Sequence, residues 1–260
     1  MTIGWDDPAC ARYYEAFCVA HDRYAFASRE LVSRAALDDC RTVVDLAAGT
    51  GRTAEAIVTE LGSDARLWCV EPAAAMRSLG QRRVSDARVS WVADLDRVPT
   101  GCDRVVCSAA LWAMTPVLAT LKAVRQKLNR GGLFLFNVPA LYLGEPDEAG
   151  GGPDPHLLEL PAMLYTGRSP TTDAPAFSAT ASDIERWLEV ADYRSERWSF
   201  RYRFTQSALR DWMKIPVLTN TLLGDLDADA RAARIDAVSS TQDPSSFRWE
   251  RWICWRAEAI

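Results

Sequence analysis

The sequence predicts an α/β fold in which helices cover both faces of a mostly parallel β-sheet. Between residues 42 and 138, short apolar segments of strand length alternate with longer segments that carry apolar residues at helical spacing. Most of the strand segments are unbroken apolar runs, which is typical of strands buried on both faces. The 260 residues are enough to bury a large apolar core.

The expected elements follow one another regularly in the first half of the chain. Two helices are expected within residues 8–37, where Pro8 suits a first helical turn. Strands are then expected at residues 42–46, 66–70, 89–92, 104–107 and 133–138. The helices between them are expected at residues 51–61, 73–83 and 116–128, and Asn129-Arg130-Gly131-Gly132 is expected to form a turn.

The pattern changes after residue 138. Residues 139–178 contain seven of the 13 prolines and five of the 14 glycines, a composition typical of a functional or disordered loop. Helices are expected again at 182–190, 205–214 and 227–238, and a last strand at 247–257. Between the first two of these helices, aromatic side chains alternate with polar ones, which predicts an edge or antiparallel strand with one wet face. The aromatic positions are Trp198, Phe200, Tyr202 and Phe204.

Composition and charge narrow the class of protein. The net charge is -5 and the pI about 5.2, with acidic and basic residues interspersed, which argues against a nucleic-acid partner. We see neither the ~20 consecutive apolar residues of a membrane helix nor a signal peptide at residues 1–10. Seven scattered cysteines without a Cys-x-x-Cys pair predict no metal site and a cytoplasmic protein.

A glycine turn follows the first expected strand. Gly49 and Gly51 stand where the strand turns into a helix, and glycine allows positive φ and the close approach of a ligand. Glu71 lies 20 residues after Gly51, at the tip of the second strand, where an acid can accept hydrogen bonds from a ribose diol. These features indicate a nucleoside site, and with Ala54 in last position they also fit the dinucleotide fingerprint.

Asp45 distinguishes between the two kinds of nucleoside site. It lies at the strand end, four residues before Gly49, where a carboxylate would repel a pyrophosphate but suits a ligand with an ammonium and a sulfonium centre. With this acid, the chain resembles the class I S-adenosylmethionine-dependent methyltransferases that act on small molecules. The resemblance covers residues 40–138 best. A nicotinamide dehydrogenase is disfavoured by the same acid.

The resemblance implies a Rossmann-like, seven-stranded sheet that is mostly parallel with its last strand antiparallel. Residues 1–260 would form a single methyltransferase domain with an N-terminal helical cap and an inserted lid over the substrate. The implied parts are a cap at 1–38, a cofactor-binding core at 39–138, a lid at 139–180 and the C-terminal part of the sheet at 181–260.

The same resemblance assigns S-adenosylmethionine to residues along the strand ends. The methionine part would be held by Asp45, Ala47, Gly49 and Gly51, although the family commonly has glycine at the position of Ala47. Glu71 would bind the ribose. The remaining implied contacts are Pro72 and Met76 beside the adenine, Asp94 and the Leu95 backbone at its amino group, Ser108 along the methionine end, and Tyr14 closing over the cofactor.

Simpler explanations exist for several of these residues. Asp45 could cap the following helix, and Glu71 could be a solvated strand end. Asp94 could belong to an ordinary turn. Met76 and Tyr14 could belong to the core.

The chain has two histidines, His21 and His156, and either could act as a general base. His156 lies in the expected lid, although an exposed loop histidine is the simpler interpretation. A base is needed only if the methyl acceptor carries a proton of high pKa, because methyl transfer itself depends on alignment and desolvation.

The predicted function is methyl transfer to an oxygen, nitrogen or carbon of a small organic metabolite, in EC class 2.1.1. The segment Ser108-Ala109-Ala110-Leu111 replaces the Asn/Asp-Pro-Pro-aromatic motif of amino-methylating DNA enzymes, and Cys107 lacks the preceding proline of cytosine-ring methylases. Two alternatives remain open: a related enzyme that performs aminopropyl transfer or a rearrangement, and a non-catalytic partner subunit. The sequence does not indicate the oligomeric state.

Overall fold

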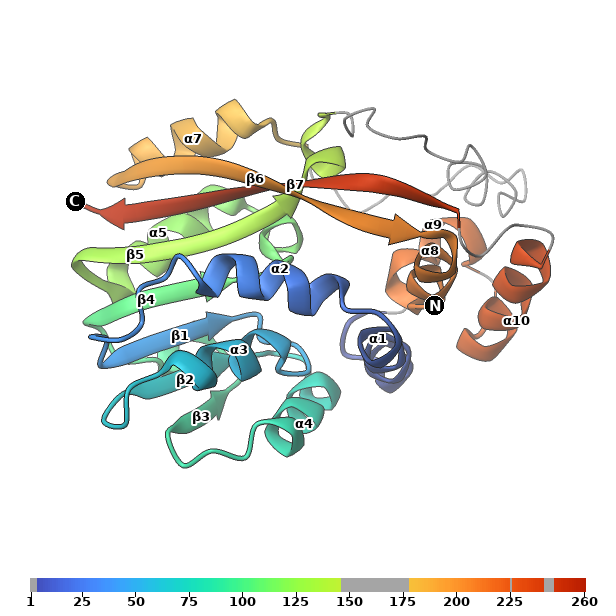
Figure 1. The fold of residues 1–260 in the computed structure, drawn as a ribbon, viewed down its shortest axis with the longest axis horizontal. Helices are drawn as coiled ribbons and strands as arrows, with labels where there is room; N and C mark the ends of the chain where they lie inside the picture. The colour runs from blue at the N-terminus through green and yellow to red at the C-terminus, as the bar shows by residue number, and fades with distance from the viewer. Residues whose placement is uncertain (1–3, 146–177, 225, 241–245) are drawn as a thin grey trace. The chain divides into compact units, whose positions relative to one another are not determined.

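The computed structural model describes residues 4–145, 178–224, 226–240 and 246–260 (Figure 1). These residues fall into two compact units, each of which we describe by itself. The sheet unit comprises residues 24–145, 178–200 and 251–260. The helical unit comprises residues 4–23, 201–224, 226–240 and 246–250.

The sheet has seven strands in the order β3-β2-β1-β4-β5-β7-β6. The strands are β1 (Thr42–Leu46), β2 (Arg66–Val70), β3 (Val89–Val92), β4 (Cys102–Cys107), β5 (Leu128–Pro139), β6 (Tyr193–Thr205) and β7 (Phe247–Ala259). The pairs β1–β2, β1–β4, β2–β3 and β4–β5 are parallel, and β7 pairs antiparallel with β5. This order confirms the predicted mostly parallel sheet with an antiparallel last strand.

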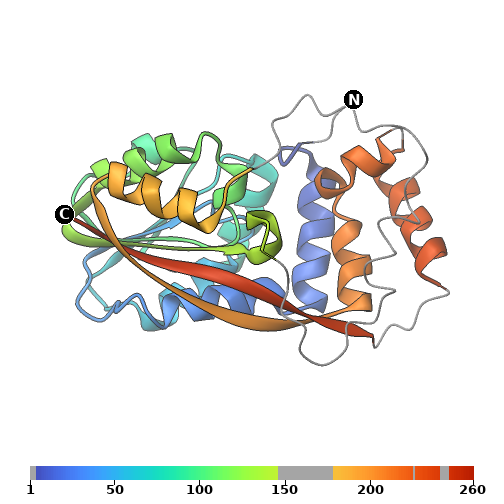
Figure 2. The ribbon, with the colours of Figure 1, turned by 90° about the horizontal axis from the view of Figure 1, so that it is seen from above.

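Helices cover both faces of the sheet. They are α2 (Arg23–Val32), α3 (Arg52–Glu60), α4 (Ala74–Arg83), α5 (Val117–Lys127) and α7 (Ala181–Val190), with short 3-10 turns η1 (Leu95–Arg97), η2 (Leu111–Ala113) and η3 (Ala140–Leu143). Figure 2 shows α5 and α7 on one face and α2 on the opposite face. The buried side chains form two apolar clusters accordingly, one containing residues of α5 and α7 and the other residues of α2 and α3.

Alternation along the strands supplies both clusters. In β1, Val43 belongs to the cluster with α2 and α3, and Val44 to the cluster with α5 and α7. In β4, Val106 and Val105 divide in the same way. By the same alternation Asp45 falls on the side of α2 and α3, and it is the charged residue of an otherwise uncharged strand.

The helical unit contains α1 (Pro8–Ala20), η4 (Pro216–Leu218) and three further helices. These are α8 (Gln206–Met213), α9 (Asn220–Leu223) and α10 (Ala228–Ser239). Side-chain caps begin the longer helices: Asp7 accepts a hydrogen bond from the backbone N–H of Ala9 at 2.8 Å, and Asp227 accepts one from Ala230 at 2.8 Å. Helix α8 packs against both α1 and α10.

The largest difference from the expected boundaries is in β5, which begins at Leu128 and includes the segment expected as a turn. Leu128 pairs with Cys102, and the register then shifts before Leu133 pairs with Arg104. Gly131 has a φ of 77° inside this irregular stretch. The glycines therefore serve a bulged strand edge, which sequence patterns do not distinguish from a turn.

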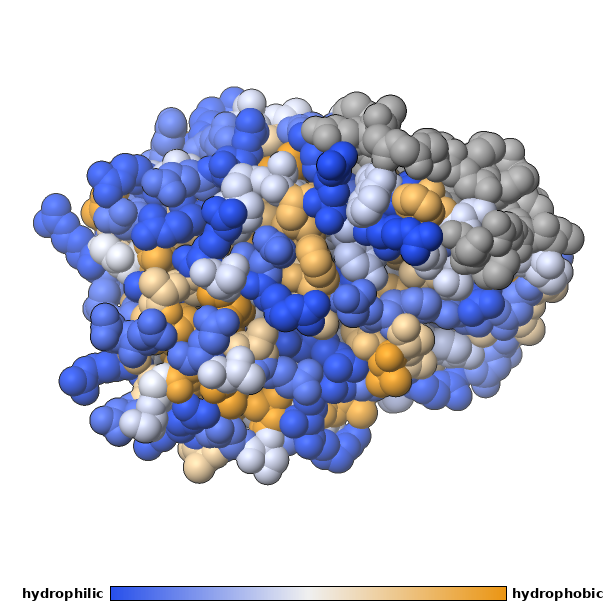
Figure 3. All heavy atoms as spheres, in the orientation of Figure 1, coloured by the Kyte–Doolittle hydropathy of each residue, from blue (hydrophilic) through white to orange (hydrophobic). Residues whose placement is uncertain are grey.

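The face of the molecule in Figure 3 is mostly hydrophilic, with apolar residues in small separate groups. Five large apolar side chains of the described residues are exposed: Val19, Leu141, Val190, Leu226 and Ile260. Among the helices described, none has both the length and the apolar character that crossing a bilayer requires.

Candidate cofactor-binding site

The carboxyl ends of β1, β2 and β4 lie next to one another at one edge of the sheet (Figure 1). Asp45 pairs in register with Cys69 of β2 and with Val106 of β4. The loops that follow these three strands therefore begin at the same edge. In open parallel sheets, this edge is where ligands bind.

Asp45 is a buried acid without a hydrogen-bond partner. Its relative exposure is 1%, and within the described residues neither carboxylate oxygen has a hydrogen-bond partner. Burial, and after it the charge of Glu71, raises the pKa of Asp45 to about 8. Buried polar atoms in native proteins nearly always have a partner, so this acid fits a ligand that brings a cationic group. The backbone N–H of Ala54, in the first turn of α3, acts in the opposite direction and lowers the pKa of Asp45, so a capping role for this acid remains an alternative.

The turn after β1 uses left-handed backbone at three positions. Ala47, Gly49 and Gly51 have φ angles of 58°, 54° and 90°. This geometry explains why glycine suits all three positions, since a left-handed conformation costs a residue with a side chain about 1–2 kcal/mol. Ala47 therefore carries backbone strain at the point where the resemblance places the cofactor.

Glu71 connects the glycine turn to the start of α4. One carboxylate oxygen accepts a hydrogen bond from the backbone N–H of Gly49 at 2.8 Å, and the other accepts one from Ala73 at 2.8 Å. Glu71 is only 7% exposed, which argues against a solvated strand end. Two of the roughly four acceptor positions of the carboxylate are thus used by backbone donors.

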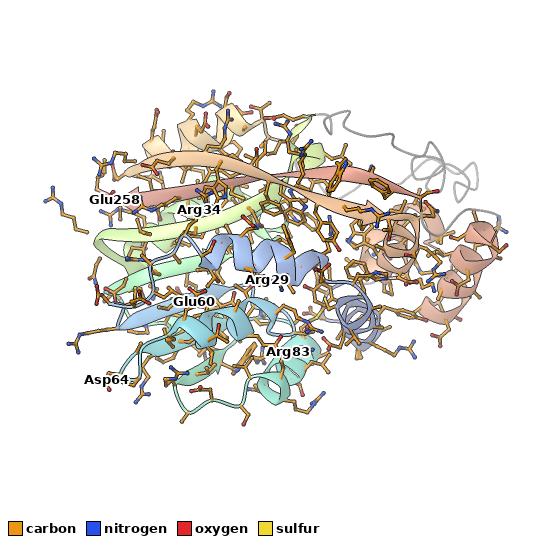
Figure 4. All side chains as sticks on the ribbon, viewed as in Figure 1. Arg29, Arg34, Glu60, Asp64, Arg83 and Glu258 are labelled. Atoms are coloured by element: carbon orange, nitrogen blue, oxygen red, sulfur yellow. The ribbon has the colours of Figure 1, made fainter. Side chains whose placement is uncertain are left out.

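Two arginines hold the backbone around this turn. Arg83, labelled in Figure 4, donates from Nε to the carbonyl oxygen of Thr50 at 2.8 Å. Arg77 donates to the carbonyl oxygens of Glu71 and Pro72 at 2.5 and 3.0 Å. Both guanidinium groups thus fix carbonyl oxygens of the loops that follow β1 and β2.

Ser108 follows β4 and ends a short chain of hydroxyl groups. The Ser28 hydroxyl lies 3.3 Å from the Ser108 hydroxyl and 2.8 Å from that of Thr53. Ser28 belongs to α2 and Thr53 to the first turn of α3. The chain therefore ties the loop after β4 to the helix that begins at the glycine turn.

Asn137 is a residue of this site that the sequence analysis did not single out. It is fully buried near the end of β5, and its amide oxygen accepts a hydrogen bond from the backbone N–H of Ala109 at 2.7 Å. Its amide nitrogen donates to the carbonyl oxygen of Ala27 at 3.2 Å. The only available signal was one polar residue within the apolar run of residues 133–138.

The four residues expected around the adenine differ in their surroundings. Pro72 precedes α4 and is exposed, and Met76 lies in the first turn of α4 and is buried. Asp94 is half-exposed and caps η1: its carboxylate accepts from the backbone N–H and Nε of Arg97 at 3.3 and 3.2 Å. Leu95 packs against the apolar cluster with α5. The geometry at Asp94 is that of an ordinary turn, and its adenine contact stays a prediction.

Two residues expected at the site belong to the helical unit, and one lies outside the described residues. The ring of Tyr14 packs edge-on against Trp5 at 6.1 Å. His21 Nε2 lies 2.9 Å from a carboxylate oxygen of Asp211, and its ring lies 5.1 Å from that of Phe17. His156 is outside the described residues.

Asp211 is the acid that orients His21. Burial alone would raise the pKa of Asp211, but hydrogen bonds from His21, Arg210 and Lys214 together hold it well below its usual range. The carboxylate is therefore ionised at neutral pH. Such a pair can hold a histidine ring in a fixed orientation as a proton acceptor.

The sheet unit therefore brings together most of the predicted cofactor residues, namely Asp45, Ala47, Gly49, Gly51, Glu71, Pro72, Met76 and Ser108. The orphaned Asp45 carboxylate and the anchored Glu71 fit a ligand with a cationic amino acid part and a ribose. Among the described residues no cluster of histidine, cysteine or acidic side chains is suited to a metal ion.

Comparisons with known proteins agree with this geometry. Residues 43–132 match the family model described as a methyltransferase domain. The chain is 32% identical over 122 residues to the ubiquinone/menaquinone biosynthesis C-methyltransferase UbiE of Rubrivivax gelatinosus. That alignment covers 44% of this chain and 47% of the relative, so the chain matches about half of the relative's length.

Solved structures share the fold at low sequence identity. The YcgJ protein from Bacillus subtilis has a TM-score of 0.58 at 12% identity, covering 90% of this chain and 99% of that one. The [4+2]-cyclase SpnF has a TM-score of 0.56 at 15% identity, covering 91% of this chain and 81% of that one. At such identities the likeness shows the fold alone.

Proposed function

We propose that this chain, whose residues 43–132 match a methyltransferase-domain family model, transfers a methyl group from S-adenosylmethionine to a small organic molecule. The observation that carries the proposal is the buried Asp45 carboxylate, which has no hydrogen-bond partner in the described residues. It lies beside a left-handed glycine turn that Glu71 anchors. This combination suits a cationic nucleoside better than a pyrophosphate.

S-adenosylmethionine supplies an electrophilic methyl group on a sulfonium centre. Asp45 would bind the cationic methionine part, and Glu71 would accept hydrogen bonds from the ribose hydroxyls. The Ser108 loop would lie along the methionine end, held by Ser28 and Asn137. These residues would bind and align, which is the larger part of the protein's task because the leaving thioether is neutral.

We assign the acceptor to the class of small organic molecules. The acidic, interspersed charge disfavours a nucleic-acid substrate. The aligned relative from Rubrivivax gelatinosus is itself named as a C-methyltransferase of quinone biosynthesis, which supports a small acceptor without choosing its reacting atom. Seven free, buried cysteines agree with a cytoplasmic location.

His21 is our first candidate for a general base, for acceptors that must lose a proton. Asp211 would orient its ring through the 2.9 Å contact with Nε2. His156 is the second candidate. Tyr14 remains our candidate for the aromatic residue over the cofactor.

Calorimetric titration with S-adenosylmethionine and S-adenosylhomocysteine tests the cofactor assignment. We expect the wild type to bind both, and Asp45→Asn to lose at least about tenfold in affinity for S-adenosylmethionine, as expected when one partner of a buried charge pair is removed. Asp64→Asn is the matched control, because that acid is exposed and is not among the residues assigned to the cofactor. No heat with either ligand would overturn the proposal and favour a non-catalytic partner subunit.

A second candidate is a non-methylating reaction in the same fold. This candidate is supported by the similarity to the [4+2]-cyclase SpnF, because that protein is named as a cyclase and shares the fold. Incubation with methyl-labelled S-adenosylmethionine and a metabolite extract distinguishes the two. Methyl transfer gives a labelled product that is heavier by one CH2 group, whereas binding of the cofactor with turnover but no label in the product supports the second candidate.

A further inference from the structure

Arg231 in α10 is a buried cation whose guanidinium is only partly satisfied. The residue has 0% exposure, and Nε donates to the carbonyl oxygen of Leu226 at 2.8 Å. Across the described part of the chain, Nη1 and Nη2 have no hydrogen-bond partner. A buried charge without a partner is strongly unfavourable, so the two terminal nitrogens of this guanidinium are suited to an anion that the described residues do not supply.

The charged and titratable side chains around Arg231 do not form an ion pair with it. Asp227, one turn before it, is exposed and uses its carboxylate to accept the Ala230 N–H at the start of α10. Cys10 is fully buried, and burial raises the pKa of its thiol to about 11, so it is neutral at physiological pH. Asp229 is engaged with Arg12 and Tyr13. The charge of Asp227 acts on Arg231 from a distance, and within the described residues no acid contacts the two terminal nitrogens of the guanidinium.

We propose that Arg231 is a binding residue for the carboxylate group of a small molecule, at a site in the helical unit. The two terminal nitrogens of a guanidinium match the two coplanar oxygens of a carboxylate. One buried cation also matches one negative charge. A phosphate dianion would keep a second charge without a partner, close to Asp227. This inference does not depend on methyl transfer.

Thermal unfolding of the full chain tests the site, with sodium benzoate as the probe. Benzamide is the neutral control of similar shape, and sodium chloride at equal concentration controls for ionic strength. We expect benzoate to raise the unfolding midpoint in a concentration-dependent manner and benzamide to leave it unchanged, because only a ligand of the folded state shifts the midpoint.

Three variants localise the effect. Arg231→Met should remove the response to benzoate, and Arg234→Met, an exposed arginine on the same helix, should keep it. Arg231→Lys keeps the charge but not the two terminal nitrogens of the guanidinium, so we expect a reduced response. If Arg231→Met does not fold, the benzoate response of Arg231→Lys is compared with that of the wild type instead.

Several results would overturn the proposal. They are an equal effect of benzoate and benzamide on the wild type, a benzoate response that persists in Arg231→Met, and a larger Arg231-dependent response to inorganic phosphate. A strong loss of stability in Arg231→Met, together with no benzoate effect on the wild type, would also overturn it. That pattern would show that the arginine pairs with an acid of the chain itself.

Discussion

The carboxylate of Glu71 accepts a 2.8 Å hydrogen bond from the backbone N–H of Gly49, 22 residues earlier in the chain. The end of β2 thus holds the turn that follows β1. The second carboxylate oxygen of Glu71 accepts a hydrogen bond from the backbone N–H of Ala73 and so holds the start of α4. One acid therefore shapes the loop and also faces the position that we assign to the ribose. Binding and local order are coupled at this residue.

Glu71→Gln should weaken both the fold and the binding of S-adenosylmethionine. A glutamine offers one acceptor oxygen, so either the Gly49 or the Ala73 N–H loses its partner in a buried place. We expect a loss of about 1–3 kcal/mol in the free energy of unfolding, the range for a buried unsatisfied donor. Urea denaturation measures this loss, and calorimetry measures the affinity.

Glu55→Gln provides the control, because that acid lies more than a third exposed and its arginine neighbours are 3.5 Å away. Its unfolding free energy should change by less than about 1 kcal/mol, the usual range for exposed ion pairs. Equal losses in both variants would contradict the role that we give to Glu71.

Asp45→Asn should stabilise the protein without cofactor, and more so as the pH rises. The pKa of Asp45 is raised from 3.8 to about 8, so between these values the folded state holds a proton that the unfolded state has released. The wild type therefore loses stability as the pH rises through this window, because the unfolded state binds fewer protons. Because asparagine does not titrate, the free energy of unfolding of the variant should depend less on pH than that of the wild type.

Urea denaturation at about pH 5 and about pH 9 checks the prediction. At the higher pH, we expect the free energy of unfolding of Asp45→Asn to exceed that of the wild type by about 1–3 kcal/mol, a range typical of burying a polar group without compensation. A wild type whose stability is unchanged between these pH values would show that the acid is ionised and has a partner.

Ala47→Gly should make the protein as stable or more stable by up to about 1 kcal/mol. Ala47 has a φ of 58°, a conformation that glycine adopts without the penalty of about 1–2 kcal/mol, although glycine also gains freedom in the unfolded chain. Denaturant midpoints measure the difference. Ala48→Gly is the matched control: Ala48 is buried and is not among the residues with positive φ, so that substitution should destabilise.

The sequence predicted the sheet and the acids of the site because both depend on local patterns. Unbroken apolar runs located β1 and β2, and Asp45 and Glu71 stood out as acids at their ends. Asn137 could not be predicted in the same way. Its role depends on hydrogen bonds to Ala109 and Ala27, which are 28 and 110 residues away in the chain.

The sequence patterns also did not predict which segments of the chain form each of the two units. The expected parts followed the chain in order, from a cap to a core to a lid. In the structure, α1 packs with α8 although nearly 200 residues separate them, because both have apolar faces that neither can bury alone. Hydrophobic periodicity identifies such faces but does not say which of them pair.

Asp211→Asn should lower stability at neutral pH and reduce the protein's sensitivity to acid. Hydrogen bonds from His21, Arg210 and Lys214 hold the pKa of Asp211 below its usual value of 3.8, despite its burial. The stability from this acid is therefore present above about pH 4 and is lost as the pH falls, because the unfolded state takes up its proton first. The variant should lack this acid-dependent part of the unfolding free energy.

Denaturation at about pH 3 and about pH 7 measures the difference, with Asp236→Asn as control. Asp236 also contacts Lys214 and Arg210, but its side chain is 52% exposed, so we expect its substitution to change stability by less than about 1 kcal/mol. If His21 is the base, Asp211→Asn and His21→Ala should both lower turnover and leave S-adenosylmethionine affinity unchanged. Unchanged turnover in His21→Ala would transfer the candidate role to His156.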